Sequence, residues 1–384
     1  MRDWIQLEQQ YELEVYPKRD VCIVRGENAK LWDDKGKMYI DCVTGNGVAL
    51  IGHANPKVAE AIARQAKTLI TCSGIFYNDV RAQFFELLMS VVPRGLKRVF
   101  ACNSGAEAVE AGIKFARYTT KKTEIICAVR AFHGRTLGAL SATYNPKYRE
   151  EFEPLVPGFH HVPFNDFEAL AEKVNENTAG ILLEPVQGEG GIHVGKEEYF
   201  QKVRKLCDEK GILLILDEVQ SGFCRTGKWF ACEHFEIEPD ILCLAKGIAG
   251  GVPMGAVVCS EKIQMGIGKH GSTFGANPLS CSAGIAAITF MKENHLEVQA
   301  QEKGTYLMEK LNALHSDRIR EIRGIGLMIG IELKEKAKPY IVSLLEKGVL
   351  TLPSGLNVIR LLPPLTIGYD ELDVVVEKLK EVLK

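Results

Sequence analysis

Short apolar runs and helical patterns alternate through the middle of the chain. The apolar runs predict buried β-strands at Val99–Cys102, Ile125–Val129, Gly180–Leu183, Leu213–Leu216, Ile241–Leu244 and Ala256–Cys259. Apolar positions at helical spacing predict helices between several of these strands, notably over residues 104–118 and 196–209. Because parallel strands need a crossover segment between them, this alternation predicts an α/β domain with a mostly parallel sheet.

The two ends of the chain have a different pattern. Before residue 50, short strands are expected at Val21–Val24, Ala29–Trp32 and Met38–Ile40, with a hairpin turn at Asp33–Gly36, and a helix is expected from Pro56. After residue 280, helices are expected over 279–294, 297–314, 336–347 and 369–382, and strands over 319–323, 327–333 and 357–362. We therefore predict a large domain over 51–278 and a smaller α+β domain over 279–384, which residues 1–50 join.

Composition narrows the class of protein. The 384 residues are 46% hydrophobic and 25% charged, which is typical of a folded chain with a substantial core. Lys and Arg number 47 and Asp and Glu 49, so the net charge of −2 gives no global field that would attract nucleic acid or an anionic membrane. The longest aliphatic run, Ile212–Leu216, is too short to span a bilayer. Neither nucleic acid nor a membrane is an expected partner.

The eleven cysteines are scattered from Cys22 to Cys281, and no two have the C-x-x-C spacing of zinc or thioredoxin-like sites. No metal site is predicted. Cys243 and Cys259 lie in apolar runs, where cysteine behaves as a small hydrophobe. The N-terminus is acidic and has no apolar stretch, so it does not look like a signal peptide. A reducing, cytoplasmic compartment is the simplest expectation.

The first candidate for chemistry is the segment from Cys102 to Glu107, where a strand ends and a helix begins. Ser104 suits the N-cap of that helix, and Glu107 three residues later predicts a capping box. Free amides and the helix dipole at such a position can bind a phosphate, although a capping box without a ligand is the commoner case.

Two further strands end in chemically useful side chains. Leu213–Leu216 is followed by Asp217 and Glu218, which are either a cap and a solvated acid or a carboxylate held to pair with a cation. Lys246 follows Ile241–Leu244 and precedes a glycine-rich turn. Most lysines are solvated surface groups, but desolvation at the ligand-binding edge of a sheet would lower the pKa of this lysine and make it nucleophilic.

A phosphate cradle, an acid and a nucleophilic lysine together suggest pyridoxal 5'-phosphate. That cofactor needs a lysine for a Schiff base, an acid facing its pyridinium nitrogen and a site for its phosphate. Only 29 residues separate Asp217 from Lys246 (246 − 217 = 29), so adjacent strands could carry both groups.

Motifs along nearly the whole chain resemble those of class III, fold-type I, pyridoxal-phosphate-dependent aminotransferases, and occur in that family's order. They lie at residues 44–47 with 52–53, 103–108, 132–136, 184–189, 217–222 with 225–227, 246–247, 271–278, 323–328 and 359–364. The chain most resembles the acetylornithine aminotransferase branch. Residues 44–49 and 145–149 are similar to relatives in carrier-protein-linked lysine biosynthesis, which act on an aminoadipate-derived amine attached to a small acidic carrier.

The resemblance implies a role for each cofactor-binding residue. Lys246 would bind the cofactor covalently and then move the proton between substrate and cofactor, and Asp217 would keep the ring nitrogen protonated. Gln220 would bond the phenolic oxygen, and Phe132 would stack on the ring. The helix start would hold the phosphate through Ser104, Gly105 and Ala106, and Thr273 would reach the phosphate of a second subunit, which implies a homodimer with shared sites.

The resemblance also implies the substrate contacts. Arg360 would bind the α-carboxylate of glutamate or 2-oxoglutarate, and Arg135 the distal carboxylate of the ω-amino substrate, because a guanidinium matches a carboxylate bidentately. Glu189 would neutralise Arg360 for the amine donor and swing away for glutamate. Ser272 is placed with the substrate-binding residues. The implied reaction is transamination between N-acetylornithine and 2-oxoglutarate in arginine biosynthesis, with the carrier-bound lysine precursor as a further substrate.

Other interpretations stay open at this point. The same fold and cofactor serve ornithine or 4-aminobutyrate transamination, racemisation and decarboxylation, although Glu189 with two arginines favours glutamate-coupled transamination. A nucleotide-binding oxidoreductase or a non-catalytic binding protein is the alternative from another class. No G-x-G-x-x-G opens a helix after the first strand, which counts against a dinucleotide site.

Overall fold

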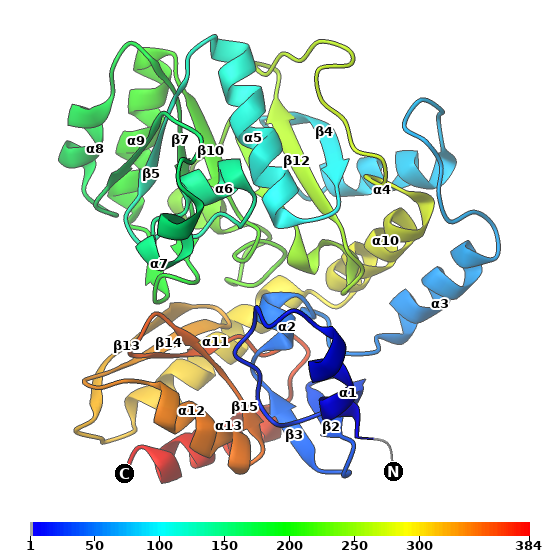
Figure 1. The fold of residues 1–384 in the computed structure, drawn as a ribbon, viewed down its shortest axis with the longest axis vertical. Helices are drawn as coiled ribbons and strands as arrows, with labels where there is room; N and C mark the ends of the chain where they lie inside the picture. The colour runs from blue at the N-terminus through cyan, green and yellow to red at the C-terminus, as the bar shows by residue number, and fades with distance from the viewer. Residues whose placement is uncertain (1–2) are drawn as a thin grey trace.

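A seven-stranded sheet forms the centre of the larger of two lobes in the computed structural model, which describes residues 3–384 (Figure 1). Its strand order is β4 (Leu96–Cys102), β12 (Gly255–Ser260), β11 (Ile241–Leu244), β10 (Leu213–Asp217), β7 (Thr178–Leu183), β5 (Glu124–Ala128) and β6 (Phe159–Val162). Only β12 runs against its neighbours, as the pairing registers show. The predicted α/β class with a mostly parallel sheet is confirmed.

Helices cover both faces of this sheet, which is why its strands are apolar on both sides. α5 (Gly105–Thr120) packs on one face, and α8 (Phe167–Lys173) and α9 (Glu197–Lys210) on the other (Figure 1). In β10, Leu213 and Ile215 belong to the core cluster under α5, and Leu214 and Leu216 belong to the opposite cluster. The unbroken apolar run in the sequence therefore reflects a strand that is buried on both faces.

The smaller lobe is an α+β layer built from both ends of the chain. Its antiparallel sheet has the order β13 (Ile319–Ile325), β14 (Met328–Leu333), β17 (Val358–Leu361) and β16 (Leu352–Ser354), with helices α11 (Leu296–Asn312), α12 (Lys338–Glu346) and α13 (Tyr369–Val382). A second sheet has the order β1 (Ile23–Glu27), β2 (Lys30–Asp33), β3 (Met38–Asp41) and β15 (Val349–Leu350). β3 and β15 run parallel, so N-terminal and C-terminal strands share one sheet (Figure 1).

The predicted hairpin at Asp33–Gly36 is confirmed. β2 and β3 pair antiparallel with Lys30 opposite Ile40, and Oδ1 of Asp33 accepts hydrogen bonds from the N–H groups of Lys35 and Lys37. The first strand is displaced from its predicted position by two to three residues, because it follows the register of β2 rather than the local apolar run. The predicted domain boundaries at 50/51 and 278/279 stay predictions.

The structure also contains shorter elements and the helices that flank the two lobes. They are α1 (Trp4–Tyr11), α2 (Thr44–Gly47), α3 (Pro56–Ala66), α4 (Asp79–Met89), α6 (Leu137–Ala142), α7 (Pro146–Arg149), η1 (Glu150–Phe152), β8 (Val186–Gln187), β9 (His193–Val194), η2 (Ala231–Phe235), η3 (Lys246–Ala249) and α10 (Pro278–Glu293). α10 packs against α3 and α4 (Figure 1). Among the described residues, none of these helices has both the length and the apolarity needed to cross a bilayer.

Glu218 fixes the loop that follows the central strand β10. Its carboxylate is completely buried and accepts hydrogen bonds from the N–H groups of Ala231 (2.6 Å) and Cys232 (2.8 Å) and from Oγ of Ser221 (3.1 Å). Burial raises the pKa of Glu218 to about 7, although these donors oppose the shift. This carboxylate therefore connects the residue after β10 to the start of η2 through hydrogen bonds.

Glu218→Gln is expected to change the pH dependence of stability. The folded-state pKa of about 7 lies above the ordinary value of 4.5, so the folded protein binds this proton more tightly than the unfolded chain. The resulting stabilisation is complete below the ordinary pKa and is lost as the pH rises through about 7. Without this group, the free energy of unfolding should decline less steeply over that range, by up to about 1.4 kcal/mol per pH unit. Urea unfolding followed by tryptophan fluorescence measures both slopes, and parallel slopes would contradict the assignment.

Candidate active site

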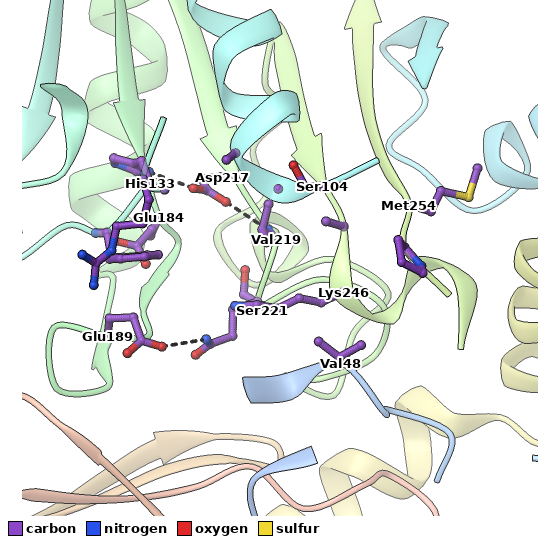
Figure 2. A pocket seen from close by; sticks show the side chains of 18 of the residues that line it. Val48, Ser104, His133, Glu184, Glu189, Asp217, Val219, Ser221, Lys246 and Met254 are labelled. Carbon is purple, nitrogen blue, oxygen red and sulfur yellow. Dashed lines mark hydrogen bonds and ion pairs between the residues drawn. The ribbon is translucent and has the colours of Figure 1, made fainter. Parts of the chain in front are cut away.

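A cavity of about 500 Å³ lies at the carboxyl ends of the parallel strands (Figure 2). Nine of the predicted site residues line this cavity: Ser104, Gly105, Ala106, Phe132, Arg135, Glu189, Asp217, Gln220 and Lys246. Asn103, which precedes Ser104, lines it as well. Ser104, Asp217 and Lys246 come from the ends of β4, β10 and β11, which are parallel strands of one sheet. The topology thus brings together the three groups that the sequence predicted separately.

The start of α5 forms one wall of the cavity. Oγ of Ser104 accepts a hydrogen bond from the N–H of Glu107 at 3.2 Å, as expected of an N-cap. The second half of the predicted capping box is wrong, because the Glu107 carboxylate accepts from the N–H of Asn103 (2.7 Å) instead of Ser104. The side chain of Asn103 also donates to Glu107 (3.1 Å), so both N–H donors of Asn103 draw the carboxylate past the cap.

Gly105 and Ala106, in the first turn of α5, line the cavity. N–H groups at this position of a helix have no acceptor within the helix and suit an anion. A Cβ on Gly105 would lie 2.7 Å from Cγ1 of Val219, so glycine is required for the helix start to pack against the loop after β10. This packing sets the distance between the amides at the start of α5 and Asp217, which precedes that loop.

Asp217 is held by two hydrogen bonds. Its Oδ1 accepts from the N–H of Val219 at 3.0 Å, and its Oδ2 lies 2.8 Å from Nδ1 of the buried His133 (Figure 2). Burial lowers the pKa of His133, but the hydrogen bond and the charge of Asp217 outweigh burial and raise that pKa overall. Sequence reasoning missed His133 as a functional residue, although it lies inside the motif at residues 132–136.

Lys246 lies across the cavity from Asp217 and Ser104 (Figure 2). It begins η3, one residue beyond β11 and Ala245, and has the left-handed φ of 45°, which is rare for a residue with a side chain. No hydrogen bond or ion pair of its amine occurs within residues 3–384. Burial lowers the pKa of Lys246, and the negative charge of Glu189 opposes the shift. The amine is therefore desolvated and free to react.

Arg360, Glu189 and Gln220 form a charge cluster between the lobes. Arg360 lies in β17 of the smaller lobe, is 1% exposed and forms an ion pair through Nη1 with Oε1 of Glu189. Gln220 contacts both, at 3.4 Å from Glu189 and 3.5 Å from Arg360. Burial raises the pKa of Glu189, but the charges of Arg360 and Lys246 outweigh burial and lower it overall. The carboxylate is thus held ionised against the guanidinium.

Arg135 has no carboxylate partner among the described residues. Its guanidinium lies 3.7 Å from the centre of the Tyr148 ring and 5.7 Å from that of Phe132. Both contacts are in the range of cation–π interactions. The Phe132 and Tyr148 rings meet edge to face, with centroids 6.1 Å apart. The aromatic pair positions the arginine at the rim of the cavity without neutralising its charge.

Glu184 is a second buried acid that sequence reasoning did not assign a role. It accepts hydrogen bonds from the N–H groups of Phe132 (3.0 Å) and Gly188 (3.2 Å), so it connects the two loops that carry Phe132 and Glu189. Burial raises the pKa of Glu184 to about 7. Its motif, residues 184–189, was visible in the sequence, but nothing in the motif indicates this contact.

Three predicted residues are not among those that line the cavity: Arg360, which contacts the lining residue Glu189, and Ser272 and Thr273. Ser272 accepts hydrogen bonds from the side chain of Asn103 and the N–H of Gly275, both at 3.0 Å, so it supports the loop before α5. Thr273 is exposed. Within residues 3–384, no group of three or more His, Cys, Asp or Glu side chains is placed to hold a metal ion.

The cavity residues fit pyridoxal phosphate. The Lys246 amine has no other partner in the described chain, the amides at the start of α5 suit a phosphate, and Asp217 presents a carboxylate held by His133. The lysine and the carboxylate line the same cavity as the cradle, which the cofactor requires.

Comparisons with known proteins agree with this chemistry. The profile of the family described as aminotransferase class-III matches residues 14–383. The chain is 48% identical to a [LysW]-aminoadipate semialdehyde transaminase from Deinococcus radiodurans, over 99% of this chain and 90% of that protein. It is 47% identical to an acetylornithine aminotransferase from Methanocaldococcus jannaschii, over 99% of this chain and 98% of that protein. The crystal structure of an ornithine aminotransferase from Toxoplasma gondii is similar to this chain with a TM-score of 0.94 and 33% identity. The match covers 99% of this chain and 94% of that one.

Lys246→Ala is expected to leave the fold intact and to abolish covalent attachment of pyridoxal phosphate. Borohydride reduction followed by mass spectrometry should label the wild-type chain at Lys246 and leave the variant with background labelling. Turnover should fall by on the order of 10²- to 10⁴-fold, which is the range for loss of a proton-transfer group. The exposed Lys205 in α9 provides a matched control, because Lys205→Ala should label and turn over normally. Normal turnover of Lys246→Ala would refute this assignment.

Proposed function

The chain belongs to the class-III aminotransferase family and uses pyridoxal 5'-phosphate; from that premise we propose that it transfers the ω-amino group of an Nα-acylated diamino acid to 2-oxoglutarate. The first candidate donor is N-acetylornithine, which yields N-acetylglutamate semialdehyde and glutamate in arginine biosynthesis. The second is an aminoadipate-derived amine attached to a small acidic carrier protein, in lysine biosynthesis. Names of relatives at 47–48% identity support both donors.

The Arg360–Glu189 pair carries the proposal. An amine donor whose reacting carbon bears no carboxylate needs a neutral site there, and the ion pair supplies one. Glutamate needs a free guanidinium at the same place, and the side chain of Glu189 is 30% exposed, so it has room to swing aside. Nε of Arg360 is buried with no partner among the described residues, which leaves a donor for the incoming carboxylate. One site can therefore accept both a donor without a carboxylate on its reacting carbon and glutamate, which carries one there.

The other residues divide the remaining work. Bound pyridoxal phosphate supplies the electron sink that stabilises negative charge at the reacting carbon. Lys246 would hold the cofactor and then move a proton as base and acid, for which its lowered pKa suits it. Asp217, oriented by His133, would hold the ring nitrogen, and Gln220 lies where it can bond the phenolic oxygen. Arg135 would bind the carboxylate at the far end of the donor.

Arg360→Ala separates the two half-reactions. We expect the half-reaction with 2-oxoglutarate to slow by on the order of 10²-fold or more, because the substrate carboxylate loses its bidentate partner. The half-reaction with N-acetylornithine should change much less. The visible absorbance of the bound cofactor reports each half-reaction: N-acetylornithine should bleach the yellow wild-type band, and 2-oxoglutarate should restore it. A wild-type band that ignores N-acetylornithine would remove this donor, and equal slowing of both half-reactions would refute the role of Arg360.

We also propose that the enzyme is a homodimer with shared sites. An exposed apolar patch lies beside Thr273 and comprises Leu69, Ile70, Ile75, Phe76, Tyr77 and Phe274. Arg81 ties its parts together by donating to the carbonyls of Cys72, Phe76 and Ala276. A patch of this kind on a soluble chain favours association, and Thr273 would reach the phosphate site of the second copy from it. The eleven free cysteines support a reducing, cytoplasmic compartment.

Phe76→Asp tests the dimer. A charge within the patch should convert the protein from the mass of two chains to that of one in light scattering, and cofactor retention should fall with it. Val298→Asp changes an exposed residue of α11 and serves as the control, with dimer and cofactor retained. A wild-type chain that is monomeric and fully active would refute the shared site.

A further inference from the structure

A second cavity of about 620 Å³ adjoins the active site. It shares Phe132 and Glu189 with the first cavity and lies between the loop at residues 144–148, the loop at 190–193 and the small-lobe loop at 353–358. Its volume is within the range of ligand pockets. An acetyl group on the donor has only one methyl beyond its carbonyl, which is far smaller than a cavity of this volume.

The charges that line this second cavity do not cancel. Its two acids are already paired, Glu189 with Arg360 and Glu332 with Arg320 and Arg323. Arg130 and Lys147 have no carboxylate partner within residues 3–384. Two cations are therefore left uncompensated, one from the loop after β5 and one from α7.

Arg130 is held in place without being neutralised. Its Nη1 donates to Nε2 of His193 at 3.0 Å, and burial together with Arg323 and Arg130 lowers the pKa of His193 to about 4, so the imidazole accepts as a neutral group. The backbone of Arg130 has the left-handed φ of 69°. Its carbonyl would lie 2.6 Å from a Cβ on Gly190, so the two loops touch here. The strained backbone and the neutral hydrogen-bond acceptor fix the position of this guanidinium but leave its positive charge available to an anion.

We propose that the second cavity binds the Nα-acyl group of the donor, that this group carries its own carboxylate, and that Arg130 and Lys147 recognise it. The inference rests on the proposed function, because it places the acyl group beyond Arg135 and the aromatic pair Phe132–Tyr148. The carboxylate has two possible sources, a free dicarboxylic acyl group or an acidic peptide linked to the donor. Both have the chemistry that unpaired cations favour.

The test uses two matched pairs of ornithine donors with the holoenzyme. In the first pair the Nα group is succinyl or its neutral amide, succinamoyl; in the second it is the peptide Asp-Asp-Gly or Asn-Asn-Gly. Wild-type enzyme should prefer the acidic member, measured as the ratio of kcat/KM values within a pair. In the Arg130→Gln/Lys147→Gln double variant this preference should fall by about tenfold at low salt and by less at high salt, because both pairings are exposed.

Controls separate the possible outcomes. Lys205→Gln, on the outer face of α9, should leave the ratio unchanged. The pair with the larger preference identifies the source of the carboxylate. Turnover of N-acetylornithine with a wild-type ratio near one, or a preference that survives in the double variant, would overturn the inference alone. Absence of turnover with every Nα-acylated ornithine would overturn the proposed function as well.

Discussion

The guanidinium of Arg360 is buried, and Glu189 supplies its counter-charge. Arg360 comes from the smaller lobe and its partner Glu189 from the larger one, so the ion pair joins the lobes at the point where the cavity lies. Removing one partner from such a pair typically costs about 3–5 kcal/mol. In the proposed function, the carboxylate of glutamate would replace Glu189 at Arg360, so binding of that substrate would act directly on the interface between the lobes.

The rest of the site follows from sheet topology. Parallel strands deliver their carboxyl ends to one edge, so Ser104, Asp217 and Lys246 meet although 142 residues (246 − 104 = 142) separate the first from the last. Around this edge, buried acids tie loops together: Glu184 holds two loops of the cavity, and Glu218 holds the loop after β10. The predicted catalytic residues lie at the ends of sheet strands, and the two buried carboxylates hold the surrounding loops in place by hydrogen bonds.

Residues at strand ends and helix starts could be predicted, since a strand that stops at an acid or a lysine is visible locally. Contacts between distant loops could not. His133 meets Asp217 across 84 residues, and Arg130 meets His193 across 63. The capping box was wrong for a local reason, because the neighbouring Asn103, which also bonds Ser272, competes for the Glu107 carboxylate. Local pattern indicates which residues reach the cavity, but packing decides which of them touch.

The parallel pairing of β3 with β15 sets an order for synthesis. A ribosome produces residues 38–41 early, yet their partner Val349–Leu350 emerges near the end. The seven strands of the large sheet are complete by residue 260, so that lobe can assemble while the N-terminal hairpin still waits. During synthesis, the sheet of the small lobe can therefore be completed only after residue 350 has emerged, and the Arg360 side of the site only after residue 360.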